Sequence, residues 1–280
     1  MSRRSPGAPL LAVVLLALLV AGPADASVVK SGGFSYVTKP FEPPPNTVRT
    51  LVAKCPPGTH VWAGGHYNSG GFGESLPRHS YPYDSGDAGT APDDGWKVQT
   101  SASEGVVVRI YATCAEPKPR YEQGSLPVAP NAQGGTSVDC DQGFEAVSGG
   151  TSGNRDLNEV KSAPDLGFGW FVAVDNYSLD PETIETFAIC IRRERFDAFD
   201  NEEVLPRTQE GHSVDCPAGT RIVGGGVGNA AQTTDIAIAA SRPVGAGNTG
   251  ADGWQVYLDN FDDATTYAFS VFATCVKPLN

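Results

Sequence analysis

The side chains best suited to binding a ligand lie in one stretch, from His66 to Asp94, where aromatic residues are followed by carboxylates. Aromatic rings stack on the apolar C–H faces of sugars, and carboxylates accept hydrogen bonds from paired hydroxyl groups. We therefore expect this stretch to bind a carbohydrate or another cell-surface ligand. The candidate ligand-binding residues are Tyr67, Phe72, His79, Tyr81, Tyr83, Asp84, Asp87 and Asp94.

A metal site has weaker support in the same stretch. Its aspartates offer oxygen ligands for calcium, but their spacing is not that of an EF-hand loop, and a solvated acidic loop is the plainer interpretation. His60, His66 and His79 could share a metal ion, although we interpret them as solvated loop residues. We predict no metal site and no cofactor, with calcium as the alternative.

The common catalytic motifs are missing from the sequence. It contains no Gly-x-Ser-x-Gly, His-Glu-x-x-His or Gly-x-x-x-x-Gly-Lys motif. A glycoside hydrolase would need two carboxylates facing one cleft, and the candidates are Glu74, Asp84 and Asp94. We predict a binding or adhesion protein that is not an enzyme and has no catalytic residue. A cell-wall-active glycoside hydrolase and a purely structural extracellular protein are the alternatives.

A threefold repeat must position these side chains. Each copy has Cys-x-x-Gly, then Gly-Gly, then Gly-Trp-x-Val, and it closes on a Cys that follows an aromatic residue and Ala. Six cysteines allow fifteen pairings, but copies that fold alike would each contain one disulfide bond. The predicted pairs are Cys55–Cys114, Cys140–Cys190 and Cys216–Cys275.

Short strands and turns are expected throughout, because the residues after each Gly-Trp alternate with period two and no helical periodicity occurs. We expect four strands in each copy, with the repeated tryptophans buried and lying flat on the Gly-Gly backbone. These tryptophans are Trp96, Trp170 and Trp254. The steps from Cys114 to Cys140 and from Cys190 to Cys216 are equal, which indicates straps packed against the fold and not loose linkers.

The sequence therefore predicts an all-β fold of three antiparallel, disulfide-bonded repeats that pack about a pseudo-threefold axis like a β-prism. The repeats span residues 34–119, 120–195 and 196–280. Three separate small β domains are the alternative. The charged segment from Ile191 to Glu203 is interpreted as a solvated strap, with self-pairing between molecules as the other interpretation.

The frame of Cys-Pro-x-Gly, Gly-Gly, Gly-Trp-x-Val and Tyr-Ala-x-Cys resembles a repeat in uncharacterised secreted proteins of high-GC Gram-positive bacteria. It is more loosely similar to the carboxy-terminal modules of shufflon-type pilus-tip adhesins. The resemblance covers nearly all of the chain after residue 26, but the second copy departs from it, with Cys140-Asp141-Gln142 in place of Cys-Pro. It brings no catalytic residue and implies a surface or secreted binding role.

The first 26 residues have the pattern of an export signal. Arg3 and Arg4 precede an apolar run, and Ala24-Asp25-Ala26 is a small-x-small cleavage site. We predict cleavage after Ala26 and a secreted, extracellular protein that does not insert into a membrane. Cleavage removes two basic side chains and one acidic one, which leaves 18 basic and 31 acidic side chains and a net charge of −13. This charge argues against nucleic acid as a partner.

Overall fold

The computed structural model describes residues 25–86, 91–165, 168–229, 233–245 and 252–279, which form β-strands and connecting turns. The strand β1 spans Ser27–Ser31. The three repeats follow it with six strands each. Repeat 1 contains β2 (Phe34–Phe41), β3 (Arg49–Lys54), β4 (His60–Asn68), β5 (Ser75–Tyr83), β6 (Gly95–Ala102) and β7 (Val108–Ala115). Repeat 2 contains β8 (Arg120–Val128), β9 (Ala132–Val138), β10 (Glu145–Ser152), β11 (Leu157–Pro164), β12 (Trp170–Asn176) and β13 (Glu182–Ile191). Repeat 3 contains β14 (Phe196–Val204), β15 (Gln209–Asp215), β16 (Arg221–Asn229), β17 (Ile236–Val244), β18 (Gly253–Asn260) and β19 (Tyr267–Val276).

The expectation of four strands in each repeat was wrong. Each predicted strap contains a further strand, β8 or β14, which pairs with β13 or β19, and β2 pairs with β7 in the same way before the first repeat's cysteine. The first expected strand is also divided in two by the turn after the opening cysteine. Gly58, Gly143 and Gly219 in these turns have φ values of 80°, 83° and 83°, a conformation that favours glycine.

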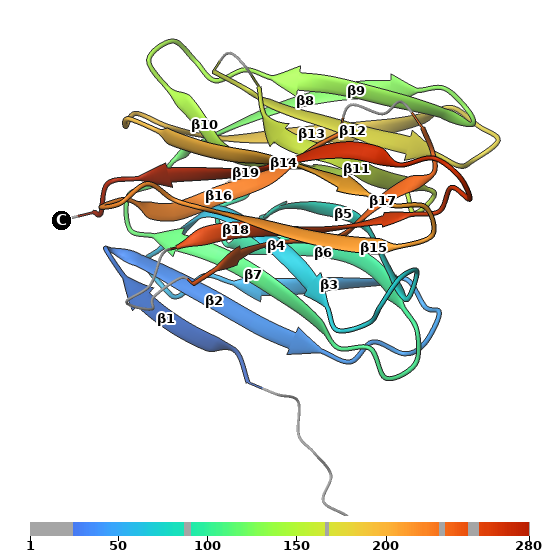
Figure 1. Ribbon diagram of the computed structural model, residues 1–280. Coiled ribbons are helices and arrows are strands. Elements are labelled where there is room, and N and C mark those ends of the chain that lie inside the picture. Colours follow the sequence, from blue (N-terminus) through green and yellow to red (C-terminus); the bar gives the residue numbers. More distant parts are fainter. Residues whose placement is uncertain (1–24, 87–90, 166–167, 230–232, 246–251, 280) are drawn as a thin grey trace, which may run out of the picture.

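Three antiparallel sheets form the fold, and each is built from two repeats (Figure 1). Sheet A has the order β1-β2-β7-β4-β17-β18-β15 and joins repeats 1 and 3. Sheet B, with the order β3-β6-β5-β10-β13-β8, joins repeats 1 and 2. Sheet C, with the order β14-β19-β16-β11-β12-β9, joins repeats 3 and 2. Every repeat thus contributes half of two sheets, and the alternative of three separate domains is wrong.

The Gly-Gly pairs explain how the half-sheets meet. The first glycine of each pair lies under the tryptophan of its own repeat, as predicted: a Cβ atom on Gly64 would lie 2.1 Å from the Trp96 ring. The second glycine faces the next half-sheet, and a Cβ atom on Gly65 would lie 2.0 Å from the carbonyl oxygen of Ser241. The equivalent atoms are 1.8 Å apart at Gly150 and 1.8 Å apart at Gly226. Side chains at these positions would hold the two half-sheets apart.

The tryptophan and the serine at each junction are also joined to each other. The indole N–H groups donate to serine hydroxyl groups of the same repeat, in the pairs Trp96–Ser80, Trp170–Ser162 and Trp254–Ser241, at 2.8, 3.0 and 2.9 Å. All three tryptophans are 1% exposed, as the sequence predicted. A buried indole needs a partner for its N–H group, and the serine provides it beside the carbonyl group that touches the next repeat.

A second set of hydrogen bonds joins the repeats in a ring. The hydroxyl group of Tyr36 donates to the carbonyl oxygen of Ile222, and that of Tyr121 donates to Val61, at 2.9 and 2.8 Å. Repeat 3 has Asp197 at this place, and Asp197 forms an ion pair with Arg195 at 2.8 Å. Arg195 in turn donates to the carbonyl oxygen of Ala146 at 2.6 Å, so the pair connects β14 of repeat 3 with repeat 2 and completes the cycle.

The predicted disulfide pairing is confirmed, and each bridge also connects two sheets. Cys55 follows β3 of sheet B and is bonded to Cys114 on β7 of sheet A. The bridge of repeat 2 connects sheets C and B, and that of repeat 3 connects sheets A and C. Between the sheets lies a core with members from all three repeats, including Ile110, Ile189 and Ile238.

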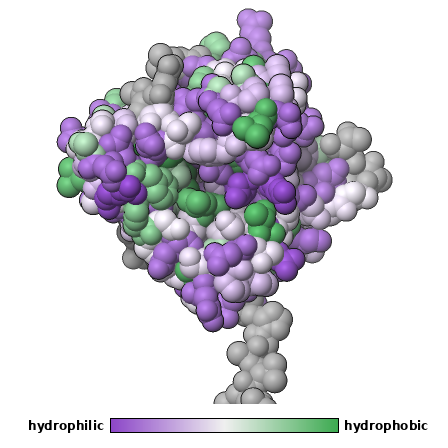
Figure 2. All heavy atoms as spheres, turned by 90° about the vertical axis from the view of Figure 1, so that its right-hand side faces the viewer, coloured by the Kyte–Doolittle hydropathy of each residue, from purple (hydrophilic) through white to green (hydrophobic). Residues whose placement is uncertain are grey.

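The two ends of the prism differ in their turns. The turns after the opening cysteines lie at the end where the C-terminus is marked (Figure 1). The opposite end is largely hydrophilic, with apolar side chains in separate small groups (Figure 2).

The predicted export signal lies outside the described residues except for its last two positions. Among the described residues no helix has the length and apolarity to cross a membrane.

Candidate ligand-binding site

The middle of each sheet carries one row of outward-facing residues that have equivalents in the other two sheets. The row contains the aromatic residue three positions before the closing cysteine, the second glycine of a Gly-Gly pair, and the residue between Ser and Pro on the neighbouring half-sheet. The antiparallel register places the last two side by side. The rows are Tyr111–Gly65–Arg242 in sheet A, Phe187–Gly150–Tyr81 in sheet B and Phe272–Gly226–Ala163 in sheet C.

In sheets A and B a large side chain covers the aromatic ring of the row. Arg242 donates to the Tyr111 hydroxyl group at 3.0 Å and to the side-chain oxygen of Gln255 at 2.7 Å. Tyr81 stacks on Phe187 with ring centroids 5.7 Å apart and planes at 13°. Tyr111 and Phe187 are consequently only 8% and 6% exposed.

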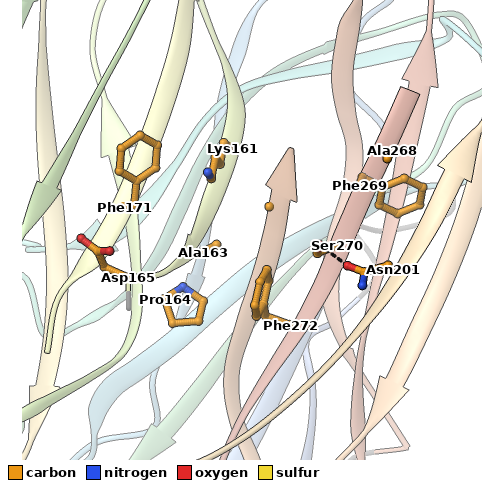
Figure 3. Close-up of a pocket in the computed structure, with 11 residues that line it drawn as sticks. Lys161, Ala163, Pro164, Asp165, Phe171, Asn201, Ala268, Phe269, Ser270 and Phe272 are labelled. Carbon is orange, nitrogen blue, oxygen red and sulfur yellow. Dashed lines mark hydrogen bonds between the residues drawn. The ribbon is translucent and has the colours of Figure 1, made fainter. Parts of the chain in front are cut away.

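Sheet C has alanine at the covering position, and a hollow of about 480 Å³ lies there. Ala163 ends at its Cβ atom, so it cannot reach across Gly226 to the ring of Phe272, which is partly exposed. The ring of Phe199 on β14 stacks on Phe272, with centroids 5.9 Å apart, and the side toward Ala163 stays uncovered. Phe171, the cross-strand partner of Ala163, stands on the other side of the hollow (Figure 3). Two phenylalanine rings therefore flank a floor made of small residues.

Polar groups lie around these rings. The Nζ atom of Lys161 is 4.6 Å from the centroid of the Phe171 ring. On the far side, the hydroxyl group of Ser270 donates to the side-chain oxygen of Asn201 at 2.6 Å (Figure 3). Asp165 also lines the hollow and accepts a hydrogen bond from the hydroxyl group of Ser137. An ammonium group, an amide, a hydroxyl group and a carboxylate thus surround an apolar floor.

The aromatic residues that the sequence singled out in repeat 1 are divided between two sheets. Tyr67 lies on β4 of sheet A, where the guanidinium group of Arg242 is 4.3 Å from its ring centroid. Tyr81 and Tyr83 lie on β5 of sheet B under the ammonium group of Lys97. Burial raises the pKa of Tyr81 and lowers that of Lys97.

The other predicted site residues are spread over both ends of the prism. Phe72 contacts Phe261 of repeat 3, with ring centroids 4.9 Å apart. Asp84 accepts a hydrogen bond from the backbone of Gly86. Hydrogen bonds from Ser85 hold the pKa of Asp94 below its ordinary value. Asp87 lies outside the described residues. Phe72 and Asp84 lie beyond opposite ends of β5, so the described members of the predicted set do not all meet at one place.

The interpretation of the first three histidines as solvated loop residues was wrong for two of them. His66 and His79 lie on strands β4 and β5 and are 3% and 1% exposed. His79 contacts the carbonyl oxygen of Asn154 at 2.7 Å, and His60 contacts the carboxylate of Asp93 at 2.8 Å. The three imidazoles therefore have separate surroundings.

Of the three carboxylates considered for a hydrolase, Glu74 lies apart from the other two. Glu74 precedes β5 and Asp84 follows it, so the length of a nine-residue strand, roughly 30 Å, separates them. Asp84 and Asp94 lie at the same end, and each accepts a hydrogen bond from a nearby backbone N–H group. A glycosidase pair requires carboxyl groups less than about 10 Å apart across a cleft.

One group of described side chains has the composition of a metal site, namely Asp200, Glu202 and His212. The imidazole nitrogens of His212 lie 3.1 Å from a carboxylate oxygen of Asp200 and 3.1 Å from one of Glu202. These contacts join the imidazole of β15 to two carboxylates of β14.

The sequence did contain a signal for the hollow. Ser-x-Pro occurs at the equivalent place of each repeat, on the strand that meets the next half-sheet, as Ser80-Tyr81-Pro82, Ser162-Ala163-Pro164 and Ser241-Arg242-Pro243. The middle residue varies while its neighbours do not. An aligned comparison of the three copies shows that Ala163 is the small one, but only the strand register shows which ring it leaves uncovered.

Comparisons with protein-family models and with curated proteins find no significant match to this chain, so the assignment of a site depends on this geometry.

Proposed function

We propose that the protein is a secreted, non-enzymatic binding protein and that the hollow of sheet C binds a carbohydrate. The observation that carries this proposal is the replacement of a covering side chain by Ala163, which leaves the Phe272 ring open on the side toward Phe171, while Phe199 stacks on the ring from β14. Apolar faces of a sugar ring fit against aromatic rings, while its hydroxyl groups pair with amide, hydroxyl and charged side chains. Lys161, Asn201 and Ser270 provide such groups.

The three disulfide bonds support the extracellular setting of this proposal, since such bonds persist in oxidising compartments. The export signal read from the sequence agrees with it. A binding role also fits a site made of strand residues on a rigid sheet, because such residues hold their positions without a ligand.

The test is to fill the hollow with the residue that sheet A has at the same place. Wild-type protein and Ala163→Arg are applied to an array of oligosaccharides and cell-wall fragments. We expect wild-type binding to at least one glycan and a loss of about tenfold or more in Ala163→Arg, because the guanidinium group would cover Phe272. The backbone accepts a long side chain here, as Arg242 and Tyr81 show in the other sheets.

Arg242→Ala is the matched control, because it changes the equivalent position on a different sheet. It should retain glycan binding, and thermal melting should show that both variants are folded. The proposal is wrong if the wild type binds no glycan, or if folded Ala163→Arg binds as the wild type does. Release of reducing sugar by the wild type would instead favour the hydrolase alternative.

A further inference from the structure

Repeat 2 departs from its two equivalents at the turn after its opening cysteine. In repeats 1 and 3 this turn ends in threonine, and the hydroxyl groups of Thr59 and Thr220 donate to the carbonyl oxygens of Pro56 and Pro217 at 2.7 and 2.6 Å. Repeat 2 has Phe144 at this place. The backbone N–H group of Phe144 still donates to the carbonyl oxygen of Asp141 at 3.0 Å, but the side-chain hydrogen bond of the turn is replaced by a half-buried aromatic ring at the surface.

Two guanidinium groups contact this ring. The Cζ atoms of Arg120 and Arg192 lie 4.3 and 4.9 Å from the centroid of Phe144. Arg120 is also paired with the carboxylate of Asp141, which neutralises it. Arg192 has no carboxylate partner among the described residues. A cation over an aromatic face is held in place while its N–H groups stay available to an acceptor.

Arg193 follows directly and likewise has no ion pair within the described part of the chain. The acidic residues nearby are already compensated: Glu145 is 3.8 Å from Arg195, and Glu194 is 3.4 Å from Lys277. Repeats 1 and 3 have proline at the position of Arg193. Two neighbouring positive charges are therefore left without a counter-charge in a chain whose net charge is strongly negative.

These arginines stand between two hollows. One, of about 310 Å³, is lined by Phe144, Phe168 and the segment from Arg192 to Glu194. The other, of about 190 Å³, lies between Phe144, Arg192 and Arg193 on one side and Pro117 to Pro119 on the other. A ligand group in either hollow would be within reach of the same two guanidinium groups.

We propose that Arg192 and Arg193 form a binding site for a single oxyanion group, either a carboxylate or a phosphate. Guanidinium groups bind these anions through two parallel hydrogen bonds, and an arginine held by a ring loses less freedom when it does so. The negative charge of the whole molecule disfavours extended polyanions, so the anion belongs to a small ligand or to one end of a larger one. This site is separate from the hollow of sheet C and does not depend on it.

The experiment is calorimetric titration of residues 27–280 with inorganic phosphate, with glucuronate, and with glucose as the uncharged counterpart of glucuronate. We expect phosphate, glucuronate or both to bind, and glucose not to bind. Arg193→Gln and Arg192→Gln should each weaken anion binding about tenfold or more. Phe144→Thr, which restores the residue of the other repeats, should weaken it as well because Arg192 is no longer held.

Arg155→Gln is the matched control. It also removes one exposed guanidinium group, but from the loop at the other end of β10. Anion binding should be unchanged in this variant and in Ala163→Arg, and thermal melting should show that every variant is folded. Phosphate binding alone would identify a phosphoryl ligand, and glucuronate binding alone a carboxylate. Failure of both anions to bind the wild type, or equal weakening by Arg155→Gln and Arg193→Gln, would overturn the proposal.

Discussion

Glu159 is a carboxylic acid buried where three strands meet. It is 7% exposed, and one of its carboxyl oxygens has no hydrogen-bond partner. Burial raises its pKa to about 8, although hydrogen bonds to the Ser162 side chain and to the backbone of Thr151 and Ser80 act in the opposite direction. The folded protein therefore binds a proton at neutral pH that the unfolded chain does not bind.

This difference predicts a stability that falls as the pH rises. Between pH 7 and 8 the unfolded chain has Glu159 ionised while the folded protein keeps it protonated, so the free energy of unfolding should fall by about 1 kcal/mol. Glu159→Gln cannot ionise and should show a flat profile over this range in urea unfolding. His66, whose pKa burial lowers to about 3, changes stability only below its ordinary pKa and is silent here. Parallel profiles for wild type and variant would contradict the assignment.

At the scale of elements, the Gly-Gly pairs determine how closely the half-sheets approach. The second glycine of each pair meets a backbone carbonyl group, which cannot move aside as a flexible side chain would. The Ser-x-Pro strand that supplies this carbonyl group also supplies the hydroxyl partner of the tryptophan. One short motif thus joins the core of one repeat to the edge of the next.

Gly65→Ala is the test of this junction. The new methyl group would lie 2.0 Å from the Ser241 oxygen, so β4 and β17 must separate, at a cost of about 1–3 kcal/mol in unfolding free energy. Gly71→Ala is the control, because nothing lies within 4 Å of a Cβ atom there. It should change stability by less than about 0.5 kcal/mol. Similar melting temperatures for the two variants would show that the contact is not tight in solution.

The sequence predicted those elements that occur three times. The cysteine pairing and the buried tryptophans were correct, because each followed from the demand that three copies fold alike. The strand count was wrong for two reasons. The turn at Gly58 separates two strands that were expected to be one, and the segment before each repeat's first cysteine contains an additional strand. The hollow at Ala163 was missed because its other wall, Phe272, comes from another repeat, and only the register of β11 against β16 brings the two together.

At the scale of the whole molecule, no repeat completes a sheet. Repeat 3 supplies β17, β18 and β15 to sheet A and β14, β19 and β16 to sheet C, and each half-sheet ends at a strand that needs a partner from another repeat. Its disulfide bond ties the two halves together but does not cover their exposed edges.

Residues 196–280 produced alone should therefore lack a cooperative thermal transition, even though they contain six strands and an intact disulfide pair. The apolar residues that face the axis would be left in water, and their burial is what stabilises the full chain. Circular dichroism melting of this fragment beside the full chain is the measurement. A sharp transition in the fragment would mean that a single repeat folds independently and that strand pairing between repeats is not required for folding.

The cyclic order of the half-sheets also has a consequence for synthesis. A ribosome delivers β4 early, but its partner β17 begins 168 residues after the end of β4, at Ile236. The edge of β4 thus stays open through the production of the two later repeats, and open edges invite pairing with other chains. When the ring closes, the last residues also reach the first hairpin, where the backbone N–H group of Leu279 donates to the carbonyl oxygen of Gly32 at 2.8 Å. The repeat that is made first is the last to be finished, so premature termination anywhere before β17 would leave an unprotected edge for aggregation.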